Sequence, residues 1–316
     1  MAWSSAAYSA ADQAAYTGNR PAVLPNALRI GYPTPAPGLI WGNPGGLAYG
    51  YPTIGYSYLV DACLHRTYCV PIAQKSLHRY LSFDPLVNKT FDTVVLWGYD
   101  AQGYNCESVS VEVSDNDNGS GNWSSIKVYP LTGIPSLDYP LVLTCLNNTY
   151  PYGTQYPRTF SARYIFLHFT GPGSSPCCPS LTEVWIGQRI NLPFSSLPQD
   201  NVAVTSEYCE ASTPRGSVAR WGGYNGKRKL AADFQLEAAT TDDTSSDKLR
   251  AFCRDRDSFV WIPAQSEAAG NPEAYLMAQE TPSTIESVSP YERSLHIAGS
   301  EQGPGHRAEV WPWSTL

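Results

Sequence analysis

Strict two-residue alternation is the feature that most constrains how this chain folds. In residues 108–114 (SVSVEVS), Val109, Val111 and Val113 hold one set of alternate positions, and serine and glutamate hold the other. Side chains of a β-strand point alternately to opposite faces, so this pattern is typical of an antiparallel strand with one buried face. Residues 92–98 (DTVVLWG) and 163–171 (RYIFLHFTG) are apolar at both sets of positions. They predict central strands of a sheet that is covered on both sides.

The segments around these strands predict more of the same architecture. Residues 125–131 (SIKVYPL) and 183–187 (EVWIG) favour further strands, and the turn formers of 114–123 (SDNDNGSGNW) predict a hairpin between the strands that flank them. Helical periodicity never lasts more than a turn or two between residues 39 and 187. We therefore expect a mainly β fold, with a β-sandwich in this region.

Composition excludes some classes of function. The net charge is −7 and charged residues make up 16% of the chain, which argues against a dedicated nucleic-acid binder, because phosphate contacts need clustered Lys and Arg. No window approaches the ~20 apolar residues of a membrane span. The first residues carry no basic or apolar signal segment. We expect no membrane insertion, no specific nucleic-acid partner, and synthesis in a cytoplasm.

A second β domain is predicted after residue 193. Residues 229–238 alternate like a strand, and 258–263 (SFVWIP) favour another strand. Between them, residues 240–255 place Leu249, Phe252 and Cys253 on one helical face. The stretch 180–193 (SLTEVWIGQRINLP) then holds the last sandwich strand and the exit from it. We predict an N-terminal arm (1–38), a β-sandwich (39–193), a β-barrel (194–299) and a C-terminal extension (300–316). Cleavage near residues 192–199 should release the sandwich.

Candidate chemistry is sparse. Asp115 and Asp117 lie in the turn-rich segment and could bind calcium through hard oxygen ligands, but the spacing departs from an EF-hand loop and a solvated turn is the alternative. His168 has apolar neighbours on its strand, which favours a hydrogen-bonded core histidine. The eight cysteines form no metal pattern, so buried free thiols are expected. With no catalytic motif in the sequence, we predict no enzymatic activity and no cofactor.

The order of these segments resembles the discoidin-type, galactose-binding-like jelly roll, in the version found in tailed-phage tail proteins. Arg163 and Tyr164, and then Trp185 and Gly187, stand where that version has matching motifs. The later segments resemble the split barrel of distal-tail and tail-adaptor proteins, with residues 215–216, Arg228 and residues 259–263 in the places of its motifs. The resemblance covers about half of the chain for the sandwich.

The resemblance implies a non-enzymatic virion protein of a tailed bacteriophage, located in the tail and made in the host bacterial cytoplasm. Such a protein forms a ring with itself, a hexamer by family precedent. The ring joins the tail tube protein to the tail tip, the baseplate hub or the fibre proteins. The alternative is a lectin-like, carbohydrate-binding module that attaches to host-surface glycans. A free-standing lectin has no need of the second domain.

Charged and aromatic residues supply the candidate contacts for such an assembly. Five cationic residues surround the Asn225–Gly226 turn of a predicted hairpin. They are candidates to pair with acidic residues of the adjacent subunit, and the alternative is a solvated hairpin without such pairs. Exposed aromatic residues are candidates for docking on partner proteins, with loop packing, glycan binding or a frayed terminus as alternatives. The cationic set is Arg215, Arg220, Lys227, Arg228 and Lys229, the acids are Asp233 and Glu237, and the aromatic residues are Trp311, Trp313, Tyr152 and Tyr156.

Overall fold

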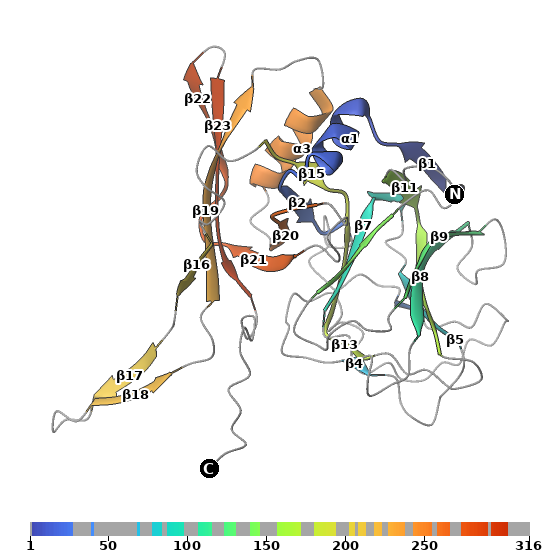
Figure 1. The fold of residues 1–316 in the computed structure, drawn as a ribbon, viewed down its shortest axis with the longest axis horizontal. Coiled ribbons are helices and arrows are strands. Elements are labelled where there is room, and N and C mark those ends of the chain that lie inside the picture. The colour runs from blue at the N-terminus through green and yellow to red at the C-terminus, as the bar shows by residue number, and fades with distance from the viewer. Residues whose placement is uncertain are drawn as a thin grey trace. The chain divides into compact units, whose positions relative to one another are not determined.

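The computed structural model divides the chain into two compact units. Unit 1 comprises Met1–Leu192 and Val260–Ala274, and unit 2 comprises Pro193–Phe259 and Tyr275–Leu316 (Figure 1). The structure describes residues 2–27, 39–40, 68–69, 78–83, 87–97, 107–115, 123–130, 140–145, 157–171, 180–193, 202–205, 208–212, 218–222, 227–237, 243–254, 258–265, 273–289 and 292–302.

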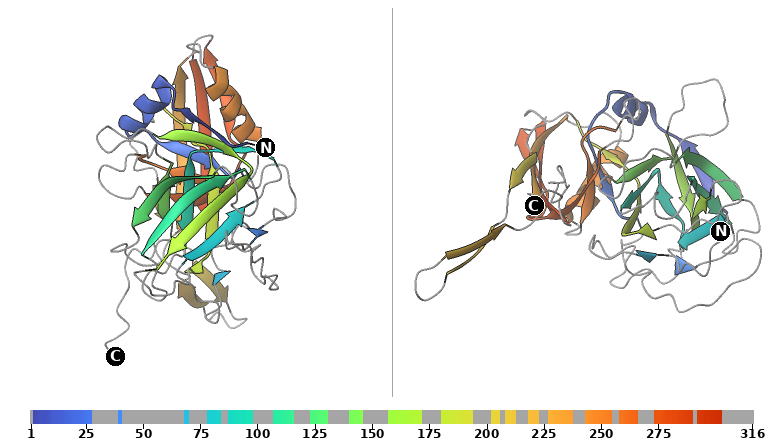
Figure 2. Two further views of the ribbon diagram at one scale, coloured as in Figure 1. Left: turned by 90° about the vertical axis from the view of Figure 1, so that its right-hand side faces the viewer. Right: turned by 60° about the horizontal axis from the view of Figure 1, so that its bottom comes forward.

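Two antiparallel sheets form the body of unit 1. The five-stranded sheet has the order β3-β5-β12-β8-β9, and the three-stranded sheet has the order β10-β7-β14. The left view of Figure 2 shows strands of the larger sheet running side by side. The larger sheet consists of β3 (Leu39–Ile40), β5 (His78–Phe83), β12 (Tyr164–Thr170), β8 (Ser108–Ser114) and β9 (Trp123–Pro130), and the smaller one of β10 (Leu141–Thr144), β7 (Thr93–Trp97) and β14 (Glu183–Gly187).

The predicted alternation builds the core between these sheets. Val109, Val111 and Val113 of β8 pack in one apolar cluster with the alternate apolar residues of β12, β7, β10 and β14. Burying this face drives the two sheets together, because each strand places every second side chain on it. The predicted hairpin is confirmed, since β8 pairs antiparallel with β9. Unit 1 is a mainly antiparallel β-sandwich, as the sequence predicts.

Short strands complete unit 1. The three-stranded sheet β1-β11-β6 and the two-stranded sheet β13-β4 are not hydrogen-bonded to the two main sheets. Strand β2 pairs with β15 and β20. These strands are β1 (Ser4–Ala7), β11 (Arg158–Ala162), β6 (Lys89–Phe91), β13 (Ser180–Leu181), β4 (Tyr68–Cys69), β15 (Ile190–Asn191), β2 (Ala22–Pro25) and β20 (Phe259–Ile262).

The start of the chain differs from the predicted arm. It contributes β1, helix α1 (Ala10–Thr17) and β2 to unit 1, and Ala22, Val23 and Leu24 are buried. Ser9 caps the helix, because its Oγ accepts a hydrogen bond from the backbone N–H of Asp12 at 3.1 Å. The helix has eight residues and one buried side chain, so it gives little apolar periodicity for a sequence pattern to reveal.

Gly187 is required for a close approach within unit 1. A Cβ atom at this position would lie 2.1 Å from the backbone oxygen of Pro25, which is well inside van der Waals contact. The indole N–H of Trp185, two residues earlier on the same face, donates to the backbone oxygen of Leu24 at 2.9 Å. The glycine therefore lets β2 pack on β14. This glycine is also the last residue of β14, where it pairs with Thr93.

Unit 2 contains an antiparallel sheet with the order β21-β23-β19-β16, and β22 also pairs with β23. A separate hairpin joins β17 (Tyr208–Ser212) to β18 (Val218–Gly222). The predicted helix is α3 (Asp243–Arg254), where Leu249 and Phe252 are buried. The sheet strands are β21 (Tyr275–Gln279), β23 (Glu292–Glu301), β19 (Lys227–Glu237), β16 (Val202–Thr205) and β22 (Thr284–Ser289).

The unit boundary after Leu192 falls beside the domain boundary drawn from the sequence at residue 193. Residues 260–274, however, belong to unit 1 although the sequence places them in the second domain. A cut near residues 192–199 would therefore leave unit 1 in two pieces, one of which stays joined to unit 2. Release of the sandwich by such a cut stays a prediction.

No helix in the described residues is long and apolar enough to cross a membrane. Two cysteines are described with free thiols, Cys145 and Cys253. Burial raises the pKa of the Cys253 thiol to about 11. This thiol is therefore a weak nucleophile near neutral pH, because thiolate is the reactive form.

Candidate functional site

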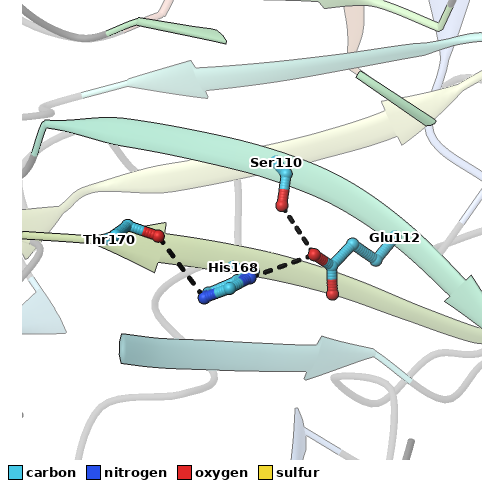
Figure 3. A network of polar contacts seen from close by, with 4 residues as sticks. All are labelled: Ser110, Glu112, His168 and Thr170. Atoms are coloured by element: carbon cyan, nitrogen blue, oxygen red, sulfur yellow. Dashed lines mark hydrogen bonds and ion pairs between the residues drawn. The ribbon is translucent and has the colours of Figure 1, made fainter. Parts of the chain in front are cut away.

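A polar cluster lies on the face of the five-stranded sheet that is turned away from the apolar core. It consists of Ser110 and Glu112 from β8 and His168 and Thr170 from β12 (Figure 3). The two strands are antiparallel neighbours, and His168 pairs with Ser110 across them. Because side chains alternate along a strand, the valines of β8 and Leu167 of β12 fill the core while these four residues share the opposite face.

Glu112 is the centre of this cluster. Its Oε1 atom accepts a hydrogen bond from the Ser110 hydroxyl at 2.7 Å and lies 3.0 Å from Nδ1 of His168. The other ring nitrogen of His168, Nε2, lies 3.4 Å from the Thr170 hydroxyl. The carboxylate thus fixes the imidazole, with the ring N–H at Nδ1 pointing to Oε1 when the histidine is neutral.

The second oxygen of the Glu112 carboxylate, Oε2, has no hydrogen-bond partner. Glu112 is 3% exposed, and its Oε2 atom is shielded from solvent without a hydrogen-bond partner. Figure 3 shows Oε2 pointing away from Ser110 and His168. A buried acceptor without a donor is costly, and more so on a charged group, so such an atom needs an explanation. A ligand that donates a hydrogen bond would provide one.

His168 is hydrogen-bonded, as the sequence predicts, but it is not a core residue. Its side chain is 15% exposed and belongs to the outward face. The sequence places apolar residues on both sides of it, because alternate residues of β12 fill the core. The partner, Glu112, is 56 residues away in the chain. No local spacing in the sequence brings the two together.

A second polar network is buried deeper in unit 1, around Arg189. The guanidinium donates from Nε to the Thr93 hydroxyl at 2.7 Å, from Nη2 to the Thr144 hydroxyl at 2.6 Å, and from Nη1 to Gln265 Oε1 at 3.4 Å. It also lies over the Tyr16 ring, 5.7 Å from the centroid. Arg189, Thr93, Thr144 and Gln265 are all at most 3% exposed. The arginine thus joins β7, β10, α1 and the segment that follows β20.

The Asp92 carboxylate lies in the same network. It accepts the backbone N–H of Arg189 at 3.1 Å and the Thr93 hydroxyl at 2.8 Å. Burial raises the pKa of Asp92, and the nearby Arg189 charge opposes that rise. Burial, together with the adjacent Asp92 charge, also raises the pKa of the Tyr8 hydroxyl. With every guanidinium nitrogen bonded within unit 1, this network has a structural role, and the cluster around Glu112 is the candidate site.

Of the two calcium candidates, the structure describes Asp115 and does not describe Asp117. Oδ1 of Asp115 accepts the backbone N–H of Trp3 at 2.7 Å, so this carboxylate helps to hold the start of the chain. Asp117 lies outside the described residues. Within the ranges that the structure describes, no three His, Cys, Asp or Glu side chains gather in a way that could hold a metal ion.

Two residues of the predicted subunit contacts have partners within their own unit. Lys229 Nζ lies 3.5 Å from Oε1 of Glu280, and Oδ1 of Asp233 lies 2.7 Å from Nδ1 of His296. Four further candidates lie on strands, but the structure does not describe their side chains: Arg220, Lys227, Arg228 and Glu237. The remaining candidates lie entirely outside the described residues: Arg215, Trp311, Trp313, Tyr152 and Tyr156. The subunit and docking contacts stay predictions.

No protein-family model matches this chain, and no curated protein sequence matches it. The C-terminal domain of a chitobiase from Bacteroides fragilis is similar in structure, with 18% identity and a TM-score of 0.32 over 43% of this chain and 82% of that one. A chitosan-binding module of a chitosanase/glucanase from Paenibacillus sp. IK-5 is similar with 17% identity and a TM-score of 0.28, over 41% and 82%. The CBM32 of AlyQ, solved with an unsaturated mannuronic acid, is similar with 17% identity and a TM-score of 0.29, over the same shares.

Proposed function

We propose that unit 1 is a non-catalytic carbohydrate-binding module and that Glu112 is its polar anchor. The observation that carries the proposal is the buried, unpartnered Oε2 atom of Glu112. Carbohydrates present hydroxyl donors, and a fixed carboxylate is a strong acceptor for them. Ser110, His168 and Thr170 hold the carboxylate in place, so little ordering of the site is needed when a sugar binds.

The test is the loss of sugar binding in Glu112→Gln. Glutamine keeps the shape of the side chain but presents an amide, with a donor in place of one acceptor and no charge. We expect the intact protein to bind at least one oligosaccharide in a panel measured by isothermal titration calorimetry. The substitution should weaken that binding at least about tenfold, because hydrogen bonds to charged groups contribute roughly 1.5–3 kcal/mol.

Asp233→Asn is the matched control, because Asp233 also pairs with a histidine but is 52% exposed in unit 2. It should leave sugar binding unchanged. The proposal fails if the folded protein binds no member of the panel. It also fails if Glu112→Gln binds as tightly as the unsubstituted protein.

We propose that the whole chain also serves as a ring-forming component of a phage tail, which displays unit 1. The supporting observation is the order of elements from β16 through the β17–β18 hairpin, β19 and α3 to β20, which follows the order of the tail-adaptor resemblance. Fold alone does not establish a function, so this candidate depends on evidence of assembly.

We expect the purified protein to show closed rings in negative-stain images. Reversing Arg220 and Arg228 to Glu should convert the rings to monomers at ordinary salt, because several charge pairs repeated around a ring act together. Lys229→Glu is the weaker control, since Lys229 already pairs with Glu280 in its own chain. Monomers in the unsubstituted protein, or rings that survive the double reversal, would contradict this second function.

A further inference from the structure

The charge balance around Glu112 indicates which donor its free oxygen needs. In the described part of the chain, its hydrogen-bond partners are the neutral Ser110 hydroxyl and the His168 imidazole, and no Lys or Arg side chain forms an ion pair with it there. Glu112 is also 3% exposed, so water compensates the carboxylate charge poorly. A buried charge is tolerated when an opposite charge and hydrogen bonds accompany it.

A hydroxyl donor and an ammonium donor would satisfy this site to different degrees. A sugar hydroxyl would fill the vacant acceptor position at Oε2 but bring no positive charge to it. A primary ammonium group would fill the same position and also neutralise the charge, and charge-assisted hydrogen bonds are the shorter and stronger kind. The net charge of −7 on the chain also attracts cationic ligands.

Resting on the carbohydrate-binding function proposed above, we infer that the site selects amino sugars that carry a free, protonated amine. The ammonium group donates to Oε2 of Glu112, while the Ser110 hydroxyl and the His168 ring keep Oε1 occupied. Because Oε2 is shielded from bulk solvent, the contact also gives the ligand one orientation, with the amine toward β8 and the rest of the sugar away from it.

The experiment compares two oligosaccharides that differ in one substituent. The probes are the tetramer of glucosamine and the tetramer of N-acetylglucosamine, titrated into the intact chain by calorimetry. N-acetylation removes the positive charge and keeps the rings and the other hydroxyls. We expect the free-amine tetramer to bind at least about tenfold more tightly, which corresponds to about 1.4 kcal/mol. Glu112→Gln should abolish this preference, and Asp233→Asn should preserve it.

A second measurement needs no substitution, so it remains informative if Glu112→Gln does not fold. Raising the pH until the sugar amine is deprotonated removes the charge of the free-amine tetramer and leaves the N-acetylated tetramer unchanged, so any titration of the protein itself acts on both probes alike. The preference for the free-amine tetramer should then disappear. Persistence of the preference at that pH would overturn the inference.

The outcomes separate this inference from the proposed function. Equal binding of the two tetramers overturns the amine selectivity and leaves carbohydrate binding standing. It would mean that the histidine supplies the compensating charge, or that the sugar donates through hydroxyls alone. Binding of neither tetramer, together with no binding in the wider panel, overturns both. A free-amine preference that Glu112→Gln leaves intact places the selectivity elsewhere and also overturns the inference.

Discussion

A polypeptide of residues 1–192 should fail to form a stably folded unit 1, although it contains both main sheets. The missing segment Val260–Ala274 belongs to unit 1 and supplies strand β20 beside β2. Val260, Trp261 and Ile262 are at most 5% exposed. Burial of each such side chain contributes roughly 1.5–3 kcal/mol, so their loss removes a large share of the ~5–15 kcal/mol that keeps a domain folded.

Urea unfolding followed by tryptophan fluorescence measures this effect. The 1–192 polypeptide should unfold at a much lower urea concentration than the full chain, or show no cooperative transition. Joining residues 258–275 to its end through a Gly/Ser linker should restore the transition, whereas the same segment with a scrambled sequence should not. If 1–192 unfolds like unit 1 in the full chain, residues 260–274 contribute nothing essential and the prediction is wrong.

Replacing Arg189 with methionine should cost unit 1 about 3–5 kcal/mol, the range found when one partner of a buried charge network is removed. Methionine fills similar space but leaves three buried acceptors, on Thr93, Thr144 and Gln265, without their donor. It also removes the positive charge that opposes the rise in the pKa of Asp92. Asp92 would then hold its proton to higher pH or remain ionised at greater cost.

Arg254→Met provides the control, because Arg254 is exposed in the last turn of α3. Its positive charge there interacts with the helix dipole and contributes at most about 1 kcal/mol. The two variants should therefore differ by several kcal/mol in the free energy of unfolding measured in urea. A similar, small effect for both would show that the Arg189 network adds little to the stability of unit 1.

Patterns that depend on nearby residues were predictable from the sequence. The alternation of Val109, Val111 and Val113 predicts both a strand and its buried face, and the structure confirms both. The spacing of Leu249 and Phe252 likewise predicts α3 and its buried side. In each case the signal repeats every two or three to four residues, so it can be read within one element.

Features that depend on distant residues were not predictable. The stretch 180–193 predicts that the last sandwich strand ends within it, and β14 ends at Gly187, but the need for a glycine there comes from Pro25, more than 150 positions earlier in the chain. The candidate site has the same property. Glu112 reads as one polar residue on an alternating strand, and only the pairing of β8 with β12 places it beside His168. The vacancy at Oε2 depends on three-dimensional burial, which no sequence spacing specifies.

The return of residues 260–274 to unit 1 also bears on how the protein is made. Ribosomes add roughly 5–20 residues per second, so Val260 is synthesised roughly 3 to 14 s after Leu192. Throughout that interval β2, which β15 and β20 flank in the finished unit, has one edge without its neighbour. Open strand edges recruit other strands. A nascent chain stalled in this interval is therefore a candidate for aggregation, and chaperone binding to it would be concentrated on unit 1.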